Sequence, residues 1–570
     1  MLAKRASKGE PDDRTDTLMT DPNTAPHTPR WGMVVDVNRC VGCQTCTVAC
    51  KHWNDTQPDV QWRKVLDIET GTFPDVERVF LVVGCQHCAE PPCVPVCPTG
   101  ATKQRADGLV TMDYDICIGC ASCAVACPYQ ARTIAHDHKW YYGEETVQES
   151  QVRHKDREGV AQKCTFCVDK LEMAEEQGLT PGVDWDVTPA CAAGCVASAI
   201  VFGDYNNPDS NVSKLTQENP YFQMHAELGT DPQIKYLYET PAVPGREPGP
   251  DEQDDERLRD PENPLVGQLQ KFWDWRAAMN WMFGGLATGF AVIGTLVYGF
   301  VQPDAQDLML THFGAAVLMA IGLFFVWLKI GRKFRAWRAI FRPQSSWMTR
   351  ELYCAAVFFP AVLAGIVFES TAAFMVAGVA ALAFLISQAK ILHMAKGIPA
   401  WRAPLIPWML TATGLFEGVG LAGIVLFFVG SAQAGGGVAA ARFLAIAGIV
   451  LALTNAALWW RYRATAQATG IPPLARDVLD GMALPLHLAG HAVPIVLFAL
   501  ALAVRTGPSV YLMVAGIAVV AGGLFWKYWM VVRAGYQQGY AFGKLPQRGS
   551  GTKAAPGRTK GAPPVQLAAE

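Results

Sequence analysis

The sequence predicts a cysteine-rich α+β domain followed by an all-α, polytopic membrane domain of about eight transmembrane helices. Two observations support this division. Sixteen of the seventeen cysteines lie between Cys40 and Cys195, and only Cys354 lies beyond them. From Ala277 onward the chain is instead one apolar run after another. A length of 570 residues allows several domains, and a formal net charge of −3 does not indicate a nucleic-acid partner.

Composition divides the chain into five segments. Residues 1–30 are polar and contain neither the apolar core of an export signal nor a twin-arginine pair, so we expect a disordered leader. Residues 241–270 form an acidic, proline-rich linker, and residues 544–570 form a disordered tail rich in Gly, Pro and Lys. The cysteine-rich domain therefore spans residues 31–240 and the membrane domain spans residues 271–543.

The sixteen cysteines fall into four sets of four. The first and third sets, "CVGCQTCTVAC" and "CIGCASCAVACP", place their cysteines two, two and three residues apart. Three thiolates at this spacing can wrap one [4Fe–4S] cube, while the fourth lies past the loop and ligates the other cluster of a pair, as in two-cluster ferredoxins. The second set is "CQHCAEPPCVPVCP", and the fourth is the separated pairs "CTFC" and "CAAGC". The pattern predicts a ferredoxin-like tandem of [4Fe–4S] sites.

Two other uses of these cysteines are possible in principle. A disulfide framework is disfavoured, because four thiols within eleven residues cannot all reach bridge geometry with distant partners. Zinc sites usually pair two Cys-x-x-Cys knuckles, and three consecutive steps of this kind are unusual for zinc. The fourth set, with its two separated pairs, is also compatible with zinc.

Several segments resemble the four-cluster electron-transfer subunit of the dimethyl-sulfoxide-reductase family. They are "RCVGCQTCTVACK", "GCQHCAEPPCVPVCPTGAT", "DGLVTMDYDICIGCASCAVACPYQAR" and "QKCTFCVDK", and the similarity covers about residues 31–240. The chain keeps Cys120, where some relatives have Trp and a [3Fe–4S] cluster. It departs from the dimethyl sulfoxide version in a longer gap between Cys167 and Cys191. That insertion, "GLTPGVDWDVTPAC", is more similar to the iron–sulfur subunits of sulfite dehydrogenase (quinone) and phenylacetyl-CoA dehydrogenase.

The resemblance implies four interleaved [4Fe–4S] clusters. Their ligand sets would be Cys40, Cys43, Cys46 with Cys195; Cys164, Cys167, Cys191 with Cys50; Cys85, Cys88, Cys93 with Cys127; and Cys117, Cys120, Cys123 with Cys97. Nearby basic residues either tune the cluster potentials or belong to a solvated or docking face; these are Lys51, His52, Arg132 and Lys163.

Eight apolar runs approach the length that spans a bilayer: 277–301, 306–329, 352–370, 372–389, 404–429, 438–460, 483–504 and 508–532. Basic residues concentrate in the loops after the even-numbered runs. The loop after the second run holds Arg332, Lys333, Arg335, Arg338, Arg342 and Arg350. The positive-inside rule therefore places these loops, and with them the cysteine-rich domain, in the cytoplasm.

The runs, with "WDWRAAMN" and "SSWMTRE", resemble the quinone-binding anchor of the same family, here fused to the electron-transfer subunit. Ionisable groups inside spans are costly and indicate function. The candidates for a quinone site are His393, Glu417, His487, His491, Asn280 and Arg350. The alternative is that they form helix–helix hydrogen bonds. Two histidines on different spans could also hold haem b, but anchors of this type are haem-free, so haem b is not expected.

The sequence contains no molybdopterin signature, P-loop or dinucleotide fingerprint. The predicted function is thus an electron conduit that transforms no substrate of its own. By the resemblance, it links a separate molybdenum bis-pterin catalytic subunit to menaquinone or ubiquinone in the cytoplasmic membrane. Quinone reduction during oxidation of sulfite or phenylacetyl-CoA is the expected direction. The alternatives are a conduit for a hydrogenase, a formate dehydrogenase or a quinol-driven reductase, and a redox sensor, which would need only one cluster.

Overall fold

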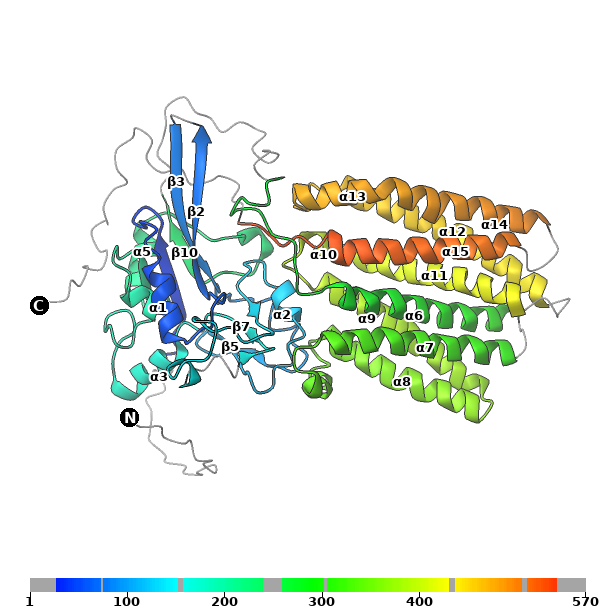
Figure 1. The fold of residues 1–570 in the computed structure, drawn as a ribbon, viewed down its shortest axis with the longest axis horizontal. Coiled ribbons are helices and arrows are strands. Elements are labelled where there is room, and N and C mark those ends of the chain that lie inside the picture. The colour runs from blue at the N-terminus through cyan, green and yellow to red at the C-terminus, as the bar shows by residue number, and fades with distance from the viewer. Residues whose placement is uncertain are drawn as a thin grey trace, which may run out of the picture.

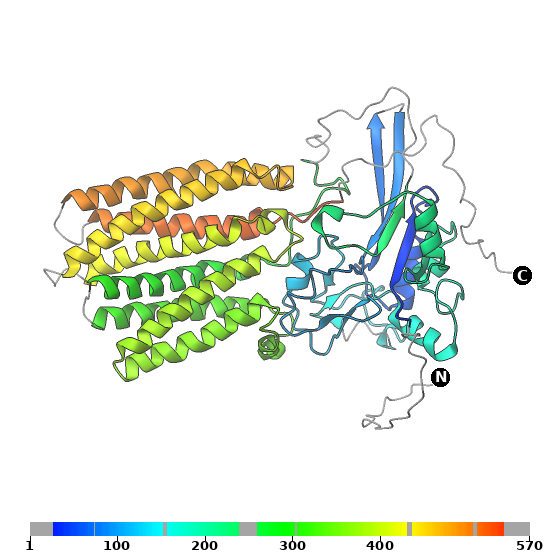
Figure 2. The same ribbon diagram turned by 180° about the vertical axis from the view of Figure 1, so that it is seen from behind.

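The computed structural model describes residues 27–72, 75–151, 157–238, 259–301, 305–429, 436–504 and 510–540. The predicted tail, most of the predicted leader and much of the predicted linker lie outside these residues. A cysteine-rich α+β domain occupies one end of the molecule, and a bundle of long helices occupies the other (Figure 1; from behind, Figure 2). The predicted fold class is confirmed.

A four-stranded sheet in the order β8-β1-β10-β9 forms the base of the cysteine-rich domain. The central strand β1 (Trp31–Asp36) pairs in parallel with β10 (Ile234–Leu237) and antiparallel with β8 (Ile200–Asp204). Met33, Val34 and Val35 are fully buried, as expected for a strand covered on both faces. The edge strand beside β10 is β9 (Tyr221–Phe222). The helices of this part of the chain are α3 (Val168–Gln177), α4 (Ala190–Ala193) and α5 (Asn211–Glu218).

The remainder of this domain consists of hairpins and short helices. The long hairpin β2 (Arg63–Thr72) and β3 (Asp75–Gly84) rises away from the sheet in Figure 1. Two small antiparallel ribbons and two helices complete it: β4 (Thr102–Gln104) with β5 (Val110–Met112), β6 (Thr133–Ile134) with β7 (Ala161–Gln162), α1 (Thr45–Trp53) and α2 (Ser122–Val125). Little regular structure is needed here, because the loops carry the cysteines.

Eight helices of the described residues are long and apolar enough to cross a membrane, as the hydropathy predicted. They are formed by α6 (Trp275–Val301), α7 (Ala305–Lys329), α8 (Trp347–Val367), α9 (Thr371–His393), α11 (Ile406–Val429), α12 (Gly436–Ala464), α13 (Pro473–Pro485) continued by α14 (Val493–Val504), and α15 (Val510–Tyr528). A short helix, α10 (Pro399–Arg402), precedes α11. A π-helical stretch, Leu486–Ala492, joins α13 to α14 within the seventh span.

The membrane helices form two bundles. The first bundle contains α6, α7, α8 and α9, and the second contains α11, α12, α13–α14 and α15. The two meet where α6 packs against α11. Glycine is required at this contact, because a Cβ atom on Gly289 would lie 1.7 Å from the carbonyl oxygen of Gly414. Such close approach of small residues is a common way for membrane helices to associate.

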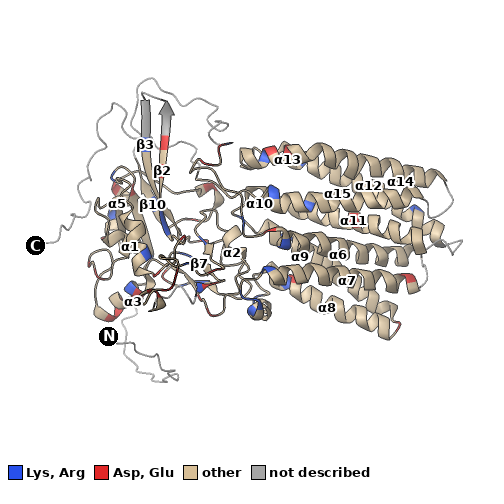
Figure 3. Cartoon of the chain, viewed as in Figure 1, with Lys and Arg blue, Asp and Glu red and all other residues tan. Residues whose placement is uncertain are grey.

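The basic ends of the bundles face the cysteine-rich domain (Figure 3). The backbone nitrogen of Arg332 donates to the carbonyl of Ile118 at 3.0 Å, and that of Gly397 donates to the carbonyl of Val125 at 3.0 Å. Hydrogen bonds between backbones fix the two parts relative to each other.

After α15 the chain returns to the cysteine-rich domain as a C-terminal strap, residues 534–540. Tyr540 donates its hydroxyl to the carbonyl of Tyr129 at 3.0 Å, and the imidazole Nε2 of His225 lies 2.7 Å from the carbonyl of Gly539. The cysteine-rich domain is therefore attached to the membrane domain at both ends of the latter.

Candidate functional site

Fifteen of the sixteen thiols lie close to one another in combinations that are compatible with the ligand sets expected from the family resemblance, and Cys46 also lies near Cys191 of a second set. Cys88 is influenced by the charges of Cys85, Cys93 and Cys127. Cys123 is influenced by Cys120, Cys97 and Cys117, Cys50 by Cys164, Cys191 and Cys167, and Cys46 by Cys191, Cys195 and Cys40. Three sets of three thus meet a fourth cysteine from another motif, and in the first set Cys40 and Cys46 meet Cys195.

Burial raises the pKa of several of these thiols. For Cys127 burial, followed by repulsion from Cys93, raises the thiol pKa to about 12, and for Cys46 burial raises it to about 11. The thiolate form that ligates iron therefore needs a compensating positive charge, such as the iron itself.

The loops of the first and third sets have the same backbone conformation. Gly42 and Gly119 both have a φ of 71°, and the residues after the second cysteine, Gln44 and Ala121, have φ of 63° and 66°. Helices α1 and α2 begin directly after these left-handed residues. A side chain on Gly119 would also clash, because its Cβ would lie 2.0 Å from the carbonyl of Gly159. The two "Cys-x-Gly-Cys" sequences thus form two loops of the same shape, each of which curves around its own set of thiols.

Two fully buried arginines lie among the thiols. Nη2 of Arg132 lies 3.0 Å from the sulfur of Cys93, and Nη2 of Arg63 lies 3.8 Å from the sulfur of Cys191. Burial alone would lower the pKa of both, but the surrounding thiols raise it. The Nε and Nη1 atoms of Arg63 have no hydrogen-bond partner among the described residues. A buried cation without a carboxylate partner fits an anionic iron–sulfur group at this place.

A neutral histidine bridges two of the thiol groups. His87 is fully buried, and burial, followed by the charge of Lys163, holds its pKa well below its usual value. The backbone nitrogen of Val110 donates to its Nδ1 at 3.1 Å, so its Nε2 carries the proton and donates to the carbonyl of Cys164 at 3.1 Å. Lys163 donates to the carbonyl of the same Cys164 at 2.7 Å. Both residues order the loop that carries Cys164.

None of the seventeen cysteines, all within the described residues, forms a disulfide. A zinc site closes four ligands on one ion, whereas a cube places each thiolate on a different iron.

The group of Cys97, Cys117, Cys120 and Cys123 lies against the membrane helices. The carbonyl of Cys120 accepts from the indole nitrogen of Trp273 at 3.1 Å and from Nζ of Lys329 at 3.0 Å. Arg335 donates to the carbonyl of Tyr114 at 2.8 Å. The anchor thus holds the loop of this thiol group through three cationic or indole donors.

A small cavity lies between this loop and the ends of α8 and α9. Its lining includes Val96 and Ser122, which neighbour Cys97 and Cys123, and from the anchor Trp273, Ser346, Trp347 and Met394. The hydroxyls of Ser345 and Ser346 are buried and have no hydrogen-bond partner among the described residues. The cavity is therefore apolar with a few unused donors, which is typical of a site for a small organic ligand.

Three of the six quinone candidates lie near this cavity. His393 precedes Met394, and Arg350 packs its guanidinium over the ring of Trp347 at 4.2 Å while its Nε donates to the carbonyl of Pro343 at 2.8 Å. Deeper in the first bundle, Nδ2 of Asn280 donates to Oε1 of Glu351 at 3.0 Å. Gln388 donates to the backbone carbonyl of Asn280 at 2.9 Å, which completes a buried amide–carboxyl network.

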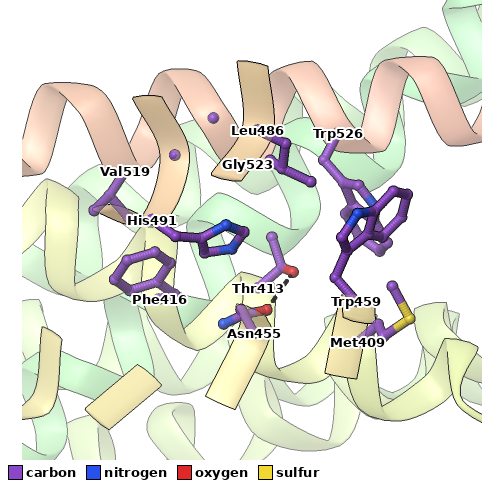
Figure 4. Close-up of a pocket in the computed structure, with 12 residues that line it drawn as sticks. Met409, Thr413, Phe416, Asn455, Trp459, Leu486, His491, Val519, Gly523 and Trp526 are labelled. Carbon is purple, nitrogen blue, oxygen red and sulfur yellow. Dashed lines mark hydrogen bonds between the residues drawn. The ribbon is translucent and has the colours of Figure 1, made fainter. Parts of the chain in front are cut away.

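The other three candidates lie in the second bundle. His487 and His491 both lie on the π-helical stretch, with ring centroids 5.4 Å apart. His491 points into a second cavity, shown in Figure 4. Glu417 forms an ion pair with Lys527 at 2.5 Å, and both side chains are fully buried. The six candidates therefore form two sites rather than one.

Several residues at these sites were missed by the sequence analysis. Lys527 stands in the last apolar run, within "FWKYWM", and its charge in a span was the available signal. Lys329 likewise ends the second apolar run, and Trp273 and Ser346 stand in the quoted motifs "WDWRAAMN" and "SSWMTRE". Arg63 gave no signal, because its role depends on a contact between segments far apart in the sequence.

The chain matches two protein-family models. The 4Fe–4S dicluster domain matches residues 76–143, and the DMSO reductase anchor subunit matches residues 279–461. A subunit of the selenate reductase of Mesobacillus selenatarsenatis is 39% identical over 36% of this chain and 72% of the relative. The chain belongs to the iron–sulfur subunits of the dimethyl-sulfoxide-reductase family.

Other family members support this placement. A subunit of the sulfite dehydrogenase of Allochromatium vinosum is 38% identical over 36% of this chain and 81% of the relative. The iron–sulfur cluster-binding subunit of menaquinone reductase from Nitratidesulfovibrio vulgaris is 37% identical over 36% of this chain and 88% of the relative. This member of the family is an iron–sulfur electron-transfer subunit fused to a multi-pass membrane anchor.

Proposed function

We propose that the chain conducts electrons between a separate molybdenum bis-pterin subunit and membrane quinone, menaquinone or ubiquinone. Four [4Fe–4S] clusters would be held by the sixteen cysteines in the ligand sets given above. Each cluster, when bound, accepts and donates one electron at a time. The cavity between Ser122 and Trp347 carries the proposal, since it touches both the loop of one thiol group and the first bundle.

Quinone would bind at this cavity, whose walls would have to move apart to admit the ring, with its head group towards Ser122 and Ser346. The unused hydroxyl of Ser346 can donate to a quinone carbonyl, and Trp273 and Trp347 supply the apolar walls. Arg350 would hold Trp347 in place, and His393 would lie at the rim. Quinone reduction also consumes two protons, for which the Asn280–Glu351–Gln388 network below is a candidate carrier.

Replacing Ser346 by alanine is expected to weaken quinone binding. The loss of one hydrogen bond, worth about 0.5–1.5 kcal/mol, corresponds to a rise in the KM for quinone of roughly twofold to tenfold. The measurement is the reoxidation of chemically reduced clusters by a quinone analogue in membranes that contain the full chain. Ser370→Ala, which alters the cap of α9 at its other end, is the matched control. An unchanged KM in Ser346→Ala would remove the cavity from the quinone site.

The catalytic subunit would dock where the first thiol group reaches the surface. Cys43 is exposed, and around it Val41, Val48 and Val196 are 54%, 63% and 73% exposed. Helix α1 and this group lie at the end of the domain remote from the membrane helices (Figure 1). Apolar residues clustered on a surface outside the membrane indicate a protein interface. Electrons would therefore enter through the group of Cys40, Cys43, Cys46 and Cys195.

Val48→Glu is expected to loosen the catalytic subunit. A carboxylate buried without a partner at an interface costs several kcal/mol, so the affinity should fall at least tenfold. Co-purification of the catalytic subunit with the full chain measures this, with iron content as a check on folding. The control is Tyr221→Glu, which likewise places a carboxylate at an exposed apolar side chain, but on β9. Equal recovery of the partner with both variants would place the docking surface elsewhere.

Two features support the orientation and direction that we propose. The basic ends of the bundles lie beside the cysteine-rich domain, which by the positive-inside rule faces the cytoplasm of the inner membrane. The similarity to a sulfite dehydrogenase subunit supports quinone reduction during oxidation of sulfite or a phenylacetyl-CoA type of substrate. Identification of the catalytic subunit that co-purifies with the full chain, followed by an assay of its activity, would identify the substrate.

A further inference from the structure

The second bundle contains a polar cavity remote from the thiol groups. It is small, and α11, α12, α15 and the π-helical stretch surround it. The side chains that point into it include Thr413 and Asn455, which share a hydrogen bond of 2.8 Å, and His491, Trp459 and Trp526 (Figure 4). The free space admits water molecules but not a quinone ring without movement of the walls.

This cavity has unused hydrogen-bonding capacity. The indole nitrogens of Trp459 and Trp526 and the Nδ1 atom of His491 have no partner among the described residues. The three residues are only 1%, 2% and 6% exposed. Buried donors and acceptors are nearly always satisfied, and a polar cavity of this size allows water to satisfy them. The cavity is therefore a place for ordered water.

A buried ion pair lies next to the cavity, beside Gly523 of its wall. Glu417 binds Nζ of Lys527 through Oε2, while its other oxygen, Oε1, has no partner among the described residues. Oε1 lies beside Gly523, which lines the cavity, since a Cβ atom there would be 2.2 Å away. One carboxylate oxygen is thus held by a cation and the other is available to water.

Protonatable groups continue from the cavity towards the cysteine-rich domain. His487 lies one π-helical turn before His491 and is only half-buried. The charge of Arg463 acts on His487, and Arg463 pairs with Asp480 at the basic end of the bundle. His487 is therefore the protonatable group next to His491 on the side of the basic end.

The ion pair also contacts α6, which carries the network of the first bundle. Nζ of Lys527 lies 2.2 Å from where a Cβ of Gly285 would be, and Nε2 of Gln388 lies 2.4 Å from where a Cβ of Gly284 would be. Two adjacent glycines of one helix therefore accommodate polar groups from the two bundles.

We propose that Glu417, Lys527 and His491, with water in the cavity, form a proton-holding site that serves quinone reduction. The inference rests on the proposed function. Quinone accepts two electrons from the cluster side and two protons to become quinol. The Glu417 carboxylate of the ion pair would first accept a proton through its free oxygen, passed from His487 through His491 and water. This proton would then leave the Glu417 carboxyl towards α6, and the carboxylate would reform beside the Lys527 ammonium.

The test uses the full chain in membranes, with chemically reduced clusters and a quinone analogue as electron acceptor. Glu417→Gln, which keeps the size of the side chain but cannot hold the proton, is expected to slow quinone reduction about tenfold or more. The solvent deuterium isotope effect should rise, and Glu417→Asp should restore part of the rate. Cluster content and the KM for quinone should not change. His312→Gln, a buried histidine at the far end of α7, is the matched control and should turn over at the normal rate.

A purely structural ion pair is separated from a proton-holding site by the double variant Glu417→Gln/Lys527→Met. Removing both charges relieves the burial of an unpaired ion, so a structural pair predicts that the double variant recovers the normal rate. The proton-holding site predicts that it stays slow. Recovery in the double variant, or an unchanged rate in Glu417→Gln, would overturn the inference while leaving the conduit intact. Absence of quinone reduction by the unaltered chain would instead overturn the conduit.

Discussion

Alanine in place of Cys97 is expected to stop quinone reduction while the remaining clusters stay in place. Cys97 belongs by sequence to the second motif, but its charge acts on Cys117, Cys120 and Cys123 of the third. In the proposed ligand sets its loss removes the cluster beside Trp273 and the membrane cavity. Iron should fall by about four atoms per chain, and electrons should reach the other clusters but not quinone.

The measurement combines iron analysis, electron paramagnetic resonance of the reduced clusters and quinone turnover. Cys354→Ala is the control, because Cys354 stands apart from the four sets and should affect none of these readings. Normal quinone turnover in Cys97→Ala would show that electrons leave by another cluster. Loss of two clusters' iron would show that the interleaved pair assembles as a unit.

Valine in place of Gly397 is expected to separate the cluster nearest the membrane from quinone without removing any iron. A Cβ atom at this position would lie 2.4 Å from the carbonyl of Cys127 and 2.7 Å from that of Val125, both of them backbone atoms that cannot move aside. Overpacking of this kind costs about 1–3 kcal/mol and shifts the backbone. Quinone turnover should therefore fall steeply, because the contact beside the thiol groups opens.

Turnover and iron content, measured on the same membranes, test this expectation. Gly299→Val is the matched control, because nothing lies within 4 Å of the corresponding Cβ on α6. A Gly397→Val chain with both normal iron and normal turnover would mean that this contact does not set the rate.

Local patterns predicted the parts of the molecule that depend on local sequence. The cysteine spacing predicts loops that wrap a group, and Gly42 and Gly119 adopt the left-handed conformation that such loops need. Hydropathy alone located the eight spans. The third helix nevertheless begins at Trp347, before the apolar run, because "WMTRE" extends its N-terminal end towards the cysteine-rich domain.

Contacts between distant segments could not be predicted in this way. Helical periodicity shows that Glu417 and Asn280 are intramembrane polar residues, but it does not show which helices face each other. It therefore grouped six candidates into one quinone site, whereas Glu417 pairs with Lys527, 110 residues away, and Asn280 with Glu351. The burial of Arg63 in a strand and the π-helical geometry at His491 likewise arise only when the chain is folded.

The C-terminal strap has a consequence for how the molecule tolerates its partner. A domain attached by one linker can rotate, and a large docked enzyme would then change its orientation relative to the bilayer. Here His225 and Tyr129 form hydrogen bonds with the C-terminal strap. The domain is therefore held at two places, which restricts its rotation. In the proposed function, one polypeptide would thus set the distance of the final electron transfer, and exchange of the docked enzyme would leave that distance unchanged.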